Sequence, residues 1–255
     1  GPPLFMVVAP HAPHPPFDKE YAPTGYLDRI PEEILWSPNV PENNPRTLTE
    51  MRVYLAMVKN FDDNLGRFLR TVDHSARGDS TLLIFTSDHG EMHGSHGRLN
   101  KMVPYAESID LPLIVRWPER LAGGGRNSSI ITPMDYLPTF AAISGAPIPS
   151  DFDGMDLSDL FQGHSSSGDP DRSVLLMNYS SHWNYFRSET PETAPDWRCW
   201  PEWRGVRTRR YTYVKWLNGD EELYDNIEDP YQLKDLSTDP AATETFELLR
   251  SELRR

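Results

Sequence analysis

The sequence predicts an α/β fold with a mixed or parallel sheet flanked by helices, followed by a small C-terminal subdomain made of an antiparallel sheet and a helix. Two observations lead to this prediction. Up to about residue 150, short apolar runs typical of buried strands alternate with segments of helical periodicity. From Trp203 onward, apolar and polar residues alternate around Asn218-Gly219, a pair that favours a hairpin turn. We expect the first part to span residues 1–165 and the second 166–255.

Three apolar runs are the predicted strands of the first part: LFMVVA at 4–9, TLLIFT at 81–86 and LPLIVRW at 111–117. Continuous runs of β-forming residues indicate strands that are buried on both faces. The first run leads into PHAPHPPF at 10–17, where four of eight residues are proline. Because proline has no N–H and a fixed φ, this segment is predicted to be a rigid loop.

The predicted helices are marked by capping signals. Thr47-x-x-Glu50 is a capping box, and the apolar residues after it recur at three- and four-residue spacing, which predicts a helix over 48–72. A second helix should run from Thr132-Pro133 to about Ser144 and end at Gly145. The remaining predicted elements are a short helix in 156–162, a strand at 174–179 and a C-terminal helix in 238–255 that begins at Thr238 or Asp239.

Composition excludes several classes of function. The 255 residues carry a formal net charge of −13, which argues against a nucleic-acid partner, because binding phosphates requires a basic face. No apolar run approaches the length that crosses a bilayer, so no membrane span is expected. Cys199 is the only cysteine, so the chain has neither an internal disulfide nor a thiolate metal site.

Side chains of the kind that bind metals gather where the second predicted strand ends, in TSDHGEMHGSHGRLNK at 86–101. In an open α/β sheet, ligands bind beyond the carboxyl ends of the strands. Asp88 and His89 offer a carboxylate and an imidazole there, and both are good metal ligands. Lys101 follows, and a lysine near a bound cation suggests an anion between the two. The alternative is that Asp88 caps a turn while His89 and Lys101 are ordinary exposed residues, as loop residues His11 and His14 would also be.

Four segments taken together resemble the formylglycine-dependent sulfatases of the alkaline phosphatase-like superfamily. They occur in the family's order and, with the stretches between them, cover most of the chain except 145–200. The segments are VVAPHAPHPPF, AMVKNFDDNLGRFL, TLLIFTSDHGEMHGSHGRLNKMVPYAESIDLPLIVRWP and LYDNIEDPYQLKDL. The resemblance implies a hydrolase that cleaves sulfate monoesters, with sulfated small molecules or glycans as substrates.

The resemblance also implies a role for each matching residue. Asp88 and His89 match two ligands of the family's divalent cation, which is usually Ca²⁺, with Mg²⁺ or Mn²⁺ as alternatives. Lys101 matches the lysine that binds the sulfate, and His14 matches the histidine that contacts the ester and protonates the departing alcohol. His11 is a weaker match to a histidine on the substrate side. These charges suit the reaction, since hydrolysis builds negative charge on the ester oxygen.

The family's nucleophile is a formylglycine made within the motif C/S-x-P-S-R, and that motif does not occur in this chain. The nearest match, CWPEWR at 199–204, lacks the Ser-Arg pair and lies far downstream of the family's position, so we treat it as coincidence. We therefore expect the chain to be a fragment, the C-terminal half of a sulfatase, that is inactive without an N-terminal half carrying the nucleophile. The resemblance alone favours a periplasmic or secreted location.

Residues 178–204 hold four tryptophans. Because aromatic faces stack on sugar rings and arginine pairs with sulfates, we hypothesise that His182, Trp183 and Arg198 border a carbohydrate subsite. The alternative is that these aromatic residues form the core of the subdomain. Three other functions stay open: a phosphonate monoester or phosphodiester hydrolase of the same superfamily, a non-catalytic remnant that binds metal or glycans, and the phosphoglycerate mutase branch. The proline-rich loop and the C-terminal hairpins argue against the last.

Overall fold

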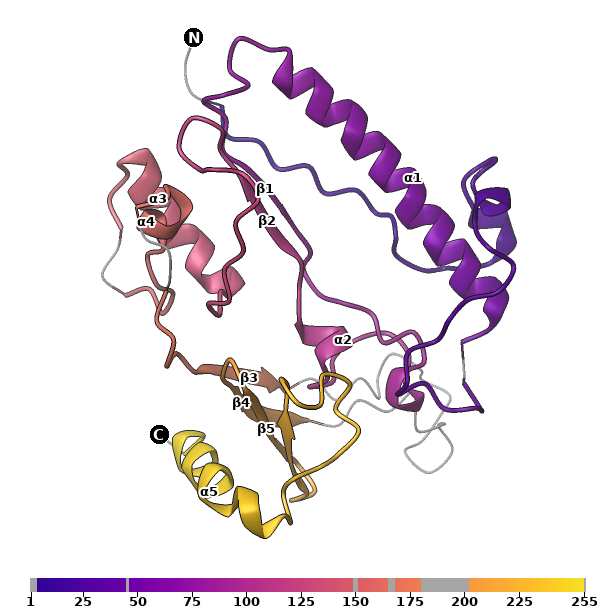
Figure 1. Ribbon diagram of the computed structural model, residues 1–255, viewed down its shortest axis with the longest axis vertical. Helices are drawn as coiled ribbons and strands as arrows, with labels where there is room; N and C mark the ends of the chain where they lie inside the picture. Colours follow the sequence, from indigo (N-terminus) through magenta and orange to yellow (C-terminus); the bar gives the residue numbers. More distant parts are fainter. Residues whose placement is uncertain (1–3, 45, 149–150, 165–167, 180–201, 255) are drawn as a thin grey trace.

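The computed structural model describes residues 4–44, 46–148, 151–164, 168–179 and 202–254. Within these ranges the chain forms a two-stranded sheet that runs beside a long helix, and a separate four-stranded sheet with one helix packed on it (Figure 1). The predicted α/β class is therefore confirmed, as is the small C-terminal antiparallel sheet with its helix.

The long helix α1 (Leu48–Asp73) matches the predicted range of 48–72. Its capping box is complete: the Thr47 hydroxyl accepts from the Glu50 N–H at 3.1 Å, and the Glu50 carboxylate accepts from the Thr47 N–H at 2.8 Å. The apolar face of α1 buries Val53 and Met57 against Phe17, the last residue of the proline-rich loop. The helix thus anchors the loop that carries His11 and His14.

Strands β1 (Leu83–Thr86) and β2 (Leu113–Arg116) form an antiparallel pair in which Leu83 faces Arg116 and Thr86 faces Leu113. Helices contact this pair from two sides. The ring of Phe61 on α1 lies 6.0 Å from that of Phe85, while the Thr86 hydroxyl lies 3.2 Å from the Tyr136 hydroxyl of α3. In Figure 1, α1 and α3 accordingly lie on opposite sides of the strands. This layering places β1, which ends two residues before Asp88, between two helical layers.

The predicted strand at 4–9 and the expected parallel pairing are not found among the described residues. Residues 4–9 are extended but pair with no described strand, and Leu4, Phe5 and Val7 are 75%, 78% and 75% exposed. Both described sheets are antiparallel. The prediction failed because an apolar run shows only that a segment favours a strand, whereas a ladder also needs a neighbour to share its backbone hydrogen bonds.

Short helices connect the sheets. The predicted helix at 132–144 is a 3-10 turn, η4 (Pro133–Asp135), continued by α3 (Tyr136–Ser144), and it ends at Gly145 with φ 73°. The predicted helix in 156–162 is α4 (Ser158–Phe161). The other short helical segments described are η1 (Lys19–Tyr21), η2 (Leu27–Arg29), η3 (Ser95–Gly97) and α2 (Ala106–Ile109).

The C-terminal sheet has the order β3-β4-β5-β6, with strands at Val174–Asn178, Trp203–Arg207, Tyr211–Trp216 and Glu221–Asp225. A 3-10 turn, η7 (Pro240–Ala242), whose N-cap is Asp239, leads into α5 (Thr243–Glu252). The alternation of side chains gives the sheet two apolar faces. One face packs against α5, as Tyr213 does. The other contributes Trp203 and Val214 to a core that also contains Met92, Val103 and Tyr105. The second face therefore lies against the segment that contains Lys101.

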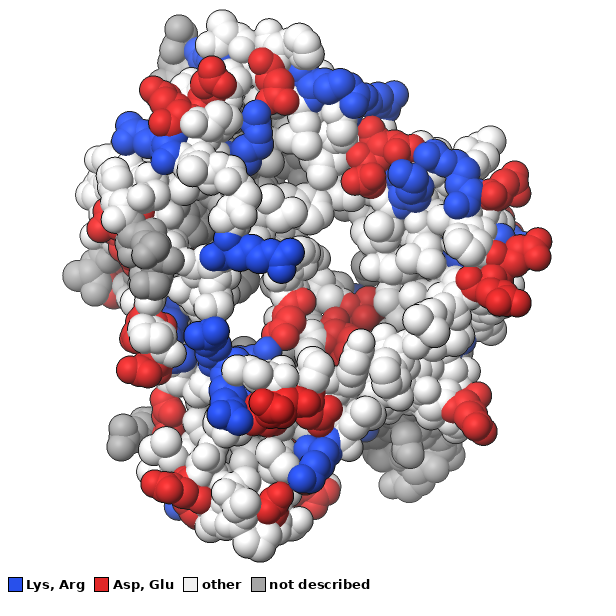
Figure 2. Space-filling model, viewed as in Figure 1, with Lys and Arg blue, Asp and Glu red and all other residues white. Residues whose placement is uncertain are grey.

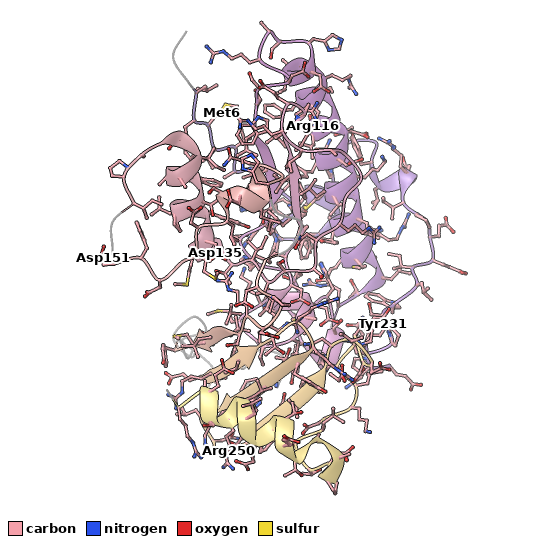
Figure 3. All side chains as sticks on the ribbon, turned by 60° about the vertical axis from the view of Figure 1, so that its left-hand side comes forward. Met6, Arg116, Asp135, Asp151, Tyr231 and Arg250 are labelled. Carbon is pink, nitrogen blue, oxygen red and sulfur yellow. The ribbon has the colours of Figure 1, made fainter. Side chains whose placement is uncertain are left out.

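Polar contacts join this sheet and the loop after it to the rest of the chain. Arg207 on β4 makes two hydrogen bonds with Asp110, at 2.7 and 2.9 Å. The buried Asn39 side chain donates to the carbonyl of Tyr231 at 3.1 Å, and Tyr231 lies at the junction in Figure 3. On the far side, Arg250 of α5 pairs with Glu221 at 3.2 Å. The two parts are thus held together on the side that faces the stretch at 86–101, which we call the motif loop.

Acidic and basic side chains are interspersed over the face of the molecule shown in Figure 2, which is hollowed near its middle. In the described part of the chain, no helix combines the length and the apolar character needed to cross a bilayer.

Candidate functional site

The Asp88-His89 pair lies immediately after β1, where the sequence predicts a cation site. The His89 Nδ1 atom lies 2.8 Å from the carbonyl oxygen of Gly90. A carbonyl only accepts, so Nδ1 donates, and the neutral ring keeps a lone pair on Nε2. That Nε2 lies 3.5 Å from the Asp88 carboxylate, whose side chain is 85% exposed. Two atoms suited to binding one cation are therefore presented together.

The donor set fits a divalent cation in part. An imidazole whose second nitrogen is held by a carbonyl, beside a carboxylate, is a common arrangement of metal ligands. Among the described residues, however, no cluster of three or more His, Cys, Asp or Glu side chains could hold a metal. Asp88 and His89 can thus supply two ligands, and the others would be water, backbone oxygens or residues outside the described ranges.

Gly90 fixes the direction in which the chain leaves this pair. Its N–H donates to the Ser108 carbonyl at 2.9 Å. A Cβ at this position would lie 1.9 Å from the Glu107 carbonyl oxygen, so no other residue fits without moving the backbone. The glycine in the DHG motif is explained by this close approach of two loops.

The loop from Glu91 to His96, which follows the Asp88-His89 pair, is held by buried side chains. Arg46 and Glu91 form an ion pair at 3.1 Å, with side chains only 6% and 12% exposed. Burial, with a smaller contribution from Arg46, lowers the pKa of His93 to about 3. Burial also lowers the pKa of His96, whose ring stacks on that of Tyr105 at 4.0 Å. Both histidines are therefore uncharged near neutral pH.

Lys101 presents an ammonium group without a protein partner in the described part of the chain. Its side chain is partly buried, and no described residue makes a hydrogen bond or ion pair with Nζ. A lysine held in a loop but left without a counter-ion is suited to bind an anionic ligand.

His11 and His14 lie together on the proline-rich loop. The His14 N–H donates to the His11 carbonyl at 3.0 Å, and the ring centroids are 4.9 Å apart. Both side chains are exposed. The His14 Nδ1 donates to the Pro15 carbonyl at 2.9 Å, so the outer nitrogen, Nε2, is the one that can exchange a proton with a ligand.

The structure brings together Asp88 with His89, and His11 with His14. Within the described residues, no hydrogen bond, ion pair or ring contact joins one pair to the other or either pair to Lys101. Their convergence on one sulfate pocket stays a prediction. The proposed sugar-binding residues, His182, Trp183 and Arg198, lie outside the described residues.

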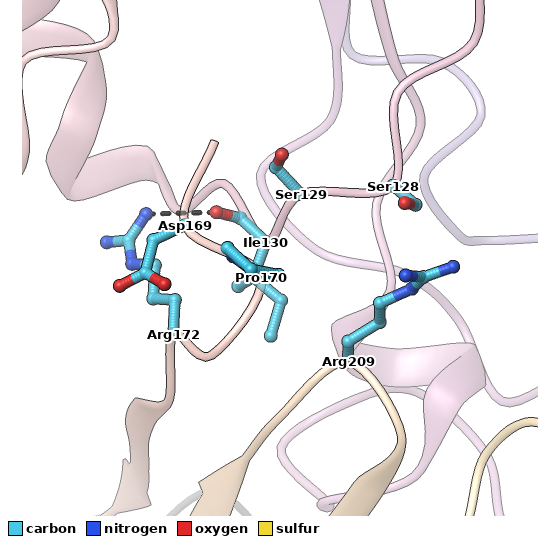
Figure 4. Close-up of a pocket in the computed structure, with 7 residues that line it drawn as sticks. All are labelled: Ser128, Ser129, Ile130, Asp169, Pro170, Arg172 and Arg209. Atoms are coloured by element: carbon cyan, nitrogen blue, oxygen red, sulfur yellow. Dashed lines mark hydrogen bonds between the residues drawn. The ribbon is translucent and has the colours of Figure 1, made fainter. Parts of the chain in front are cut away.

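A small cavity of about 90 Å³ lies elsewhere, between the loop at 128–130, the loop at 169–172 and the turn that joins β4 to β5 (Figure 4). Arg172 borders it and donates to the Ile130 carbonyl at 2.9 Å. Its lining residues are Ser128, Ser129, Ile130, Asp169, Pro170, Arg172 and Arg209. No candidate site residue is among them, so this cavity is separate from the predicted sulfate pocket.

Sequence reasoning missed three residues that hold the motif loop: Asn39, Asn178 and Trp203. Asn39 donates to Glu107 at 2.6 Å and lies 3.2 Å from the His96 ring nitrogen. Asn178 and Trp203 both contact the Met102 carbonyl. No local signal could have found them, because contacts between a side chain and a distant backbone carbonyl leave no periodic pattern.

The family follows from the fold and from the sequence together. The family profile described as Sulfatase matches residues 1–146, and the one described as N-sulphoglucosamine sulphohydrolase, C-terminal, matches residues 94–255. The chain belongs to the sulfatase family, and its fold is that of sulfatases of the alkaline phosphatase-like superfamily.

Similar proteins include an ulvan-active sulfatase from Formosa agariphila, which is 32% identical over 98% of this chain and 45% of its own length. This chain therefore spans about half of that relative. A structure solved with its substrate D-glucosamine-2-N,6-O-disulfate has a TM-score of 0.70 at 26% identity, covering 81% of this chain and 40% of the other. A phosphonate monoester hydrolase of Agrobacterium radiobacter has a TM-score of 0.64 at 24% identity over 81% of this chain and 41% of its own, a likeness of fold alone.

Proposed function

We propose that the protein containing this chain is a sulfuric ester hydrolase that cleaves sulfate monoesters of carbohydrates. The observation that carries the proposal is that the matched segment 1–146 holds the Asp88-His89 pair at the end of β1 and the unpaired ammonium of Lys101. The amino-sugar disulfate named as the substrate of a similar structure supports the choice of carbohydrate. By family resemblance, the protein is exported to the periplasm or secreted.

Each side chain has a part in the proposed mechanism. Lys101 binds a sulfate oxygen and offsets its charge. His14, with Nδ1–H held by the Pro15 carbonyl, gives its Nε2 proton to the departing alcohol oxygen as general acid. His11 contacts the substrate beside it. Asp88 and His89 hold a divalent cation, Ca²⁺ or alternatively Mg²⁺ or Mn²⁺, which when bound supplies positive charge beside the sulfate.

The remaining parts of the proposed site lie elsewhere. C/S-x-P-S-R does not occur in these 255 residues, so the proposal assigns the formylglycine nucleophile to a part of the protein outside them. His182, Trp183 and Arg198 would border the sugar ring.

The full-length protein should hydrolyse a 6-O-sulfated glucosamine and should lose this activity after EDTA treatment. Removal of the cation takes away charge stabilisation at the sulfate, and added Ca²⁺, Mg²⁺ or Mn²⁺ should restore the rate.

A second measurement tests the substrate class by comparing kcat/KM on this sugar with kcat/KM on an aryl phosphonate monoester. A higher value on the phosphonate would instead establish the phosphonate hydrolase. Activity on neither substrate would indicate a non-catalytic remnant.

A further inference from the structure

The backbone around Lys101 adopts a conformation that its sequence does not favour. Asn100 has φ 65° and Met102 has φ 77°, so the lysine lies between two residues in the left-handed region. A side chain with a Cβ is unfavourable there, least so for asparagine, and such a conformation persists only where surrounding contacts enforce it. The contacts that hold these two residues therefore determine where Lys101 lies.

The residue before Lys101 is fixed from within the motif loop. The Asn100 N–H donates to the Glu91 carboxylate at 2.7 Å, and the Asn100 carbonyl accepts from the Met92 N–H at 2.7 Å. Glu91 is in turn paired with the buried Arg46.

The residue after Lys101 is fixed from the C-terminal sheet. The Met102 carbonyl accepts from the Trp203 indole N–H at 2.8 Å and from the Asn178 side-chain amide at 3.3 Å. Asn178 on β3 and Trp203 on β4 are direct partners in the ladder, so both side chains project from one face of the sheet. They are 8% and 5% exposed, and a carbonyl that accepts from two buried donors has little freedom to turn.

The Trp203 donor is itself held by packing. Trp203 packs edge-to-face on Trp216, with ring centroids 6.5 Å apart, and the same core includes Val103, which follows Met102. The position of the Met102 carbonyl therefore depends on the C-terminal sheet and on no flexible surface group.

We propose that Trp203 and Asn178 are positioning residues for Lys101, through which the C-terminal sheet sets the place of the lysine ammonium in the sulfate pocket. The inference rests on the proposed function, because it assumes that Lys101 binds the sulfate. On this proposal, Trp203 and Asn178 of the C-terminal sheet affect catalysis through Lys101 and do not contact the substrate themselves.

The test uses Trp203→Phe in the full-length enzyme, with kcat/KM measured on the sulfated sugar. This change keeps an aromatic ring in the core but removes the indole N–H together with part of the indole volume, and the control variant shares the loss of volume. We expect kcat/KM to fall about tenfold, the usual consequence of losing one buried hydrogen bond that orients a catalytic group. Trp117→Phe is the matched control, since it loses the same atoms. The Trp117 indole N–H, just past the end of β2, has no hydrogen-bond partner among the described residues, and Trp117 lies outside the core that contains Trp203. Its kcat/KM should stay within about twofold of the wild type, with thermal melts checking that both variants fold.

A double-mutant cycle separates positioning from general destabilisation. In the Lys101→Ala background, Trp203→Phe should lower kcat/KM no further, because the lysine that it positions is gone. A tenfold fall that persists in that background would overturn the positioning role and leave the role of Lys101 intact.

If Trp203→Phe does not fold, Asn178→Leu takes its place in the same cycle with the same two outcomes. If the wild type hydrolyses the sulfate ester but Lys101→Ala has no effect, the positioning inference fails with the assignment of the lysine, while the sulfatase function stands. Absence of any wild-type sulfatase activity would contradict the proposed function itself.

Discussion

Replacing Lys101 with alanine in the full-length enzyme should lower kcat/KM for a sulfate monoester by about 10²- to 10³-fold, the usual effect of removing one donor that stabilises developing negative charge. The melting temperature should hardly change, because the Lys101 ammonium makes no hydrogen bond or ion pair with a described residue. Steady-state kinetics and a thermal melt on the same preparation measure the two effects.

The control for this variant is Lys234→Ala. Lys234 is also a lysine, but its side chain is 70% exposed and pairs with Asp239 at 3.5 Å, away from the motif loop. Its removal should leave kcat/KM unchanged. If Lys101→Ala were as active as the control, Lys101 would not be the sulfate-binding residue.

Asp135→Ala should lower the free energy of unfolding by about 3–5 kcal/mol, because it leaves a largely buried guanidinium without its partner. Asp135 is fully buried, and Arg172, with a side chain 12% exposed, donates to both of its carboxylate oxygens at 2.8 Å. The backbone N–H groups of Thr132 and Met155 donate to the same carboxylate at 2.7 and 2.9 Å. Chemical denaturation of the wild type and the variant measures the loss.

The Asp135 contribution should also depend on pH. Burial raises the pKa of Asp135, but the hydrogen bonds from Arg172, Thr132 and Met155 outweigh it and hold the pKa below its usual value. A lowered pKa in the folded state stabilises the protein above the ordinary aspartate pKa of about 3.9, and this stabilisation is lost as the pH falls below that value. The difference in stability between wild type and Asp135→Ala should therefore shrink in acid. Asp159, with a side chain 78% exposed, is the control, and a loss as large from Asp159→Ala would contradict this account.

Local signals in the sequence predicted most of the described elements. The capping box of Thr47 and the apolar periodicity after it located α1, and Gly145 marked the end of α3 because its positive φ suits glycine. The Asn218-Gly219 pair located the β5–β6 turn. These signals act over a few residues, so they survive in any tertiary context.

The strand prediction that failed and the contacts that were not predicted both depend on partners distant in sequence. The run at 4–9 has the composition of a strand, but no described segment pairs with it. The adjacency of Asp88 and His89 followed from the motif, whereas the bond between Trp203 and Met102 joins residues 101 positions apart. Which carbonyl a buried indole meets is decided by the packing of a whole sheet face, and no pattern in one sequence records it.

A crystal structure of the full-length protein, grown with Ca²⁺ and a slowly hydrolysed sulfated glucosamine, would test the central claim most directly. We expect the cation to be bound by Asp88 and His89, with the sulfate group within hydrogen-bond distance of Lys101 and His14. The account would be contradicted by a structure in which the sulfate binds away from Lys101 and His14, or in which the cation binds without Asp88 and His89.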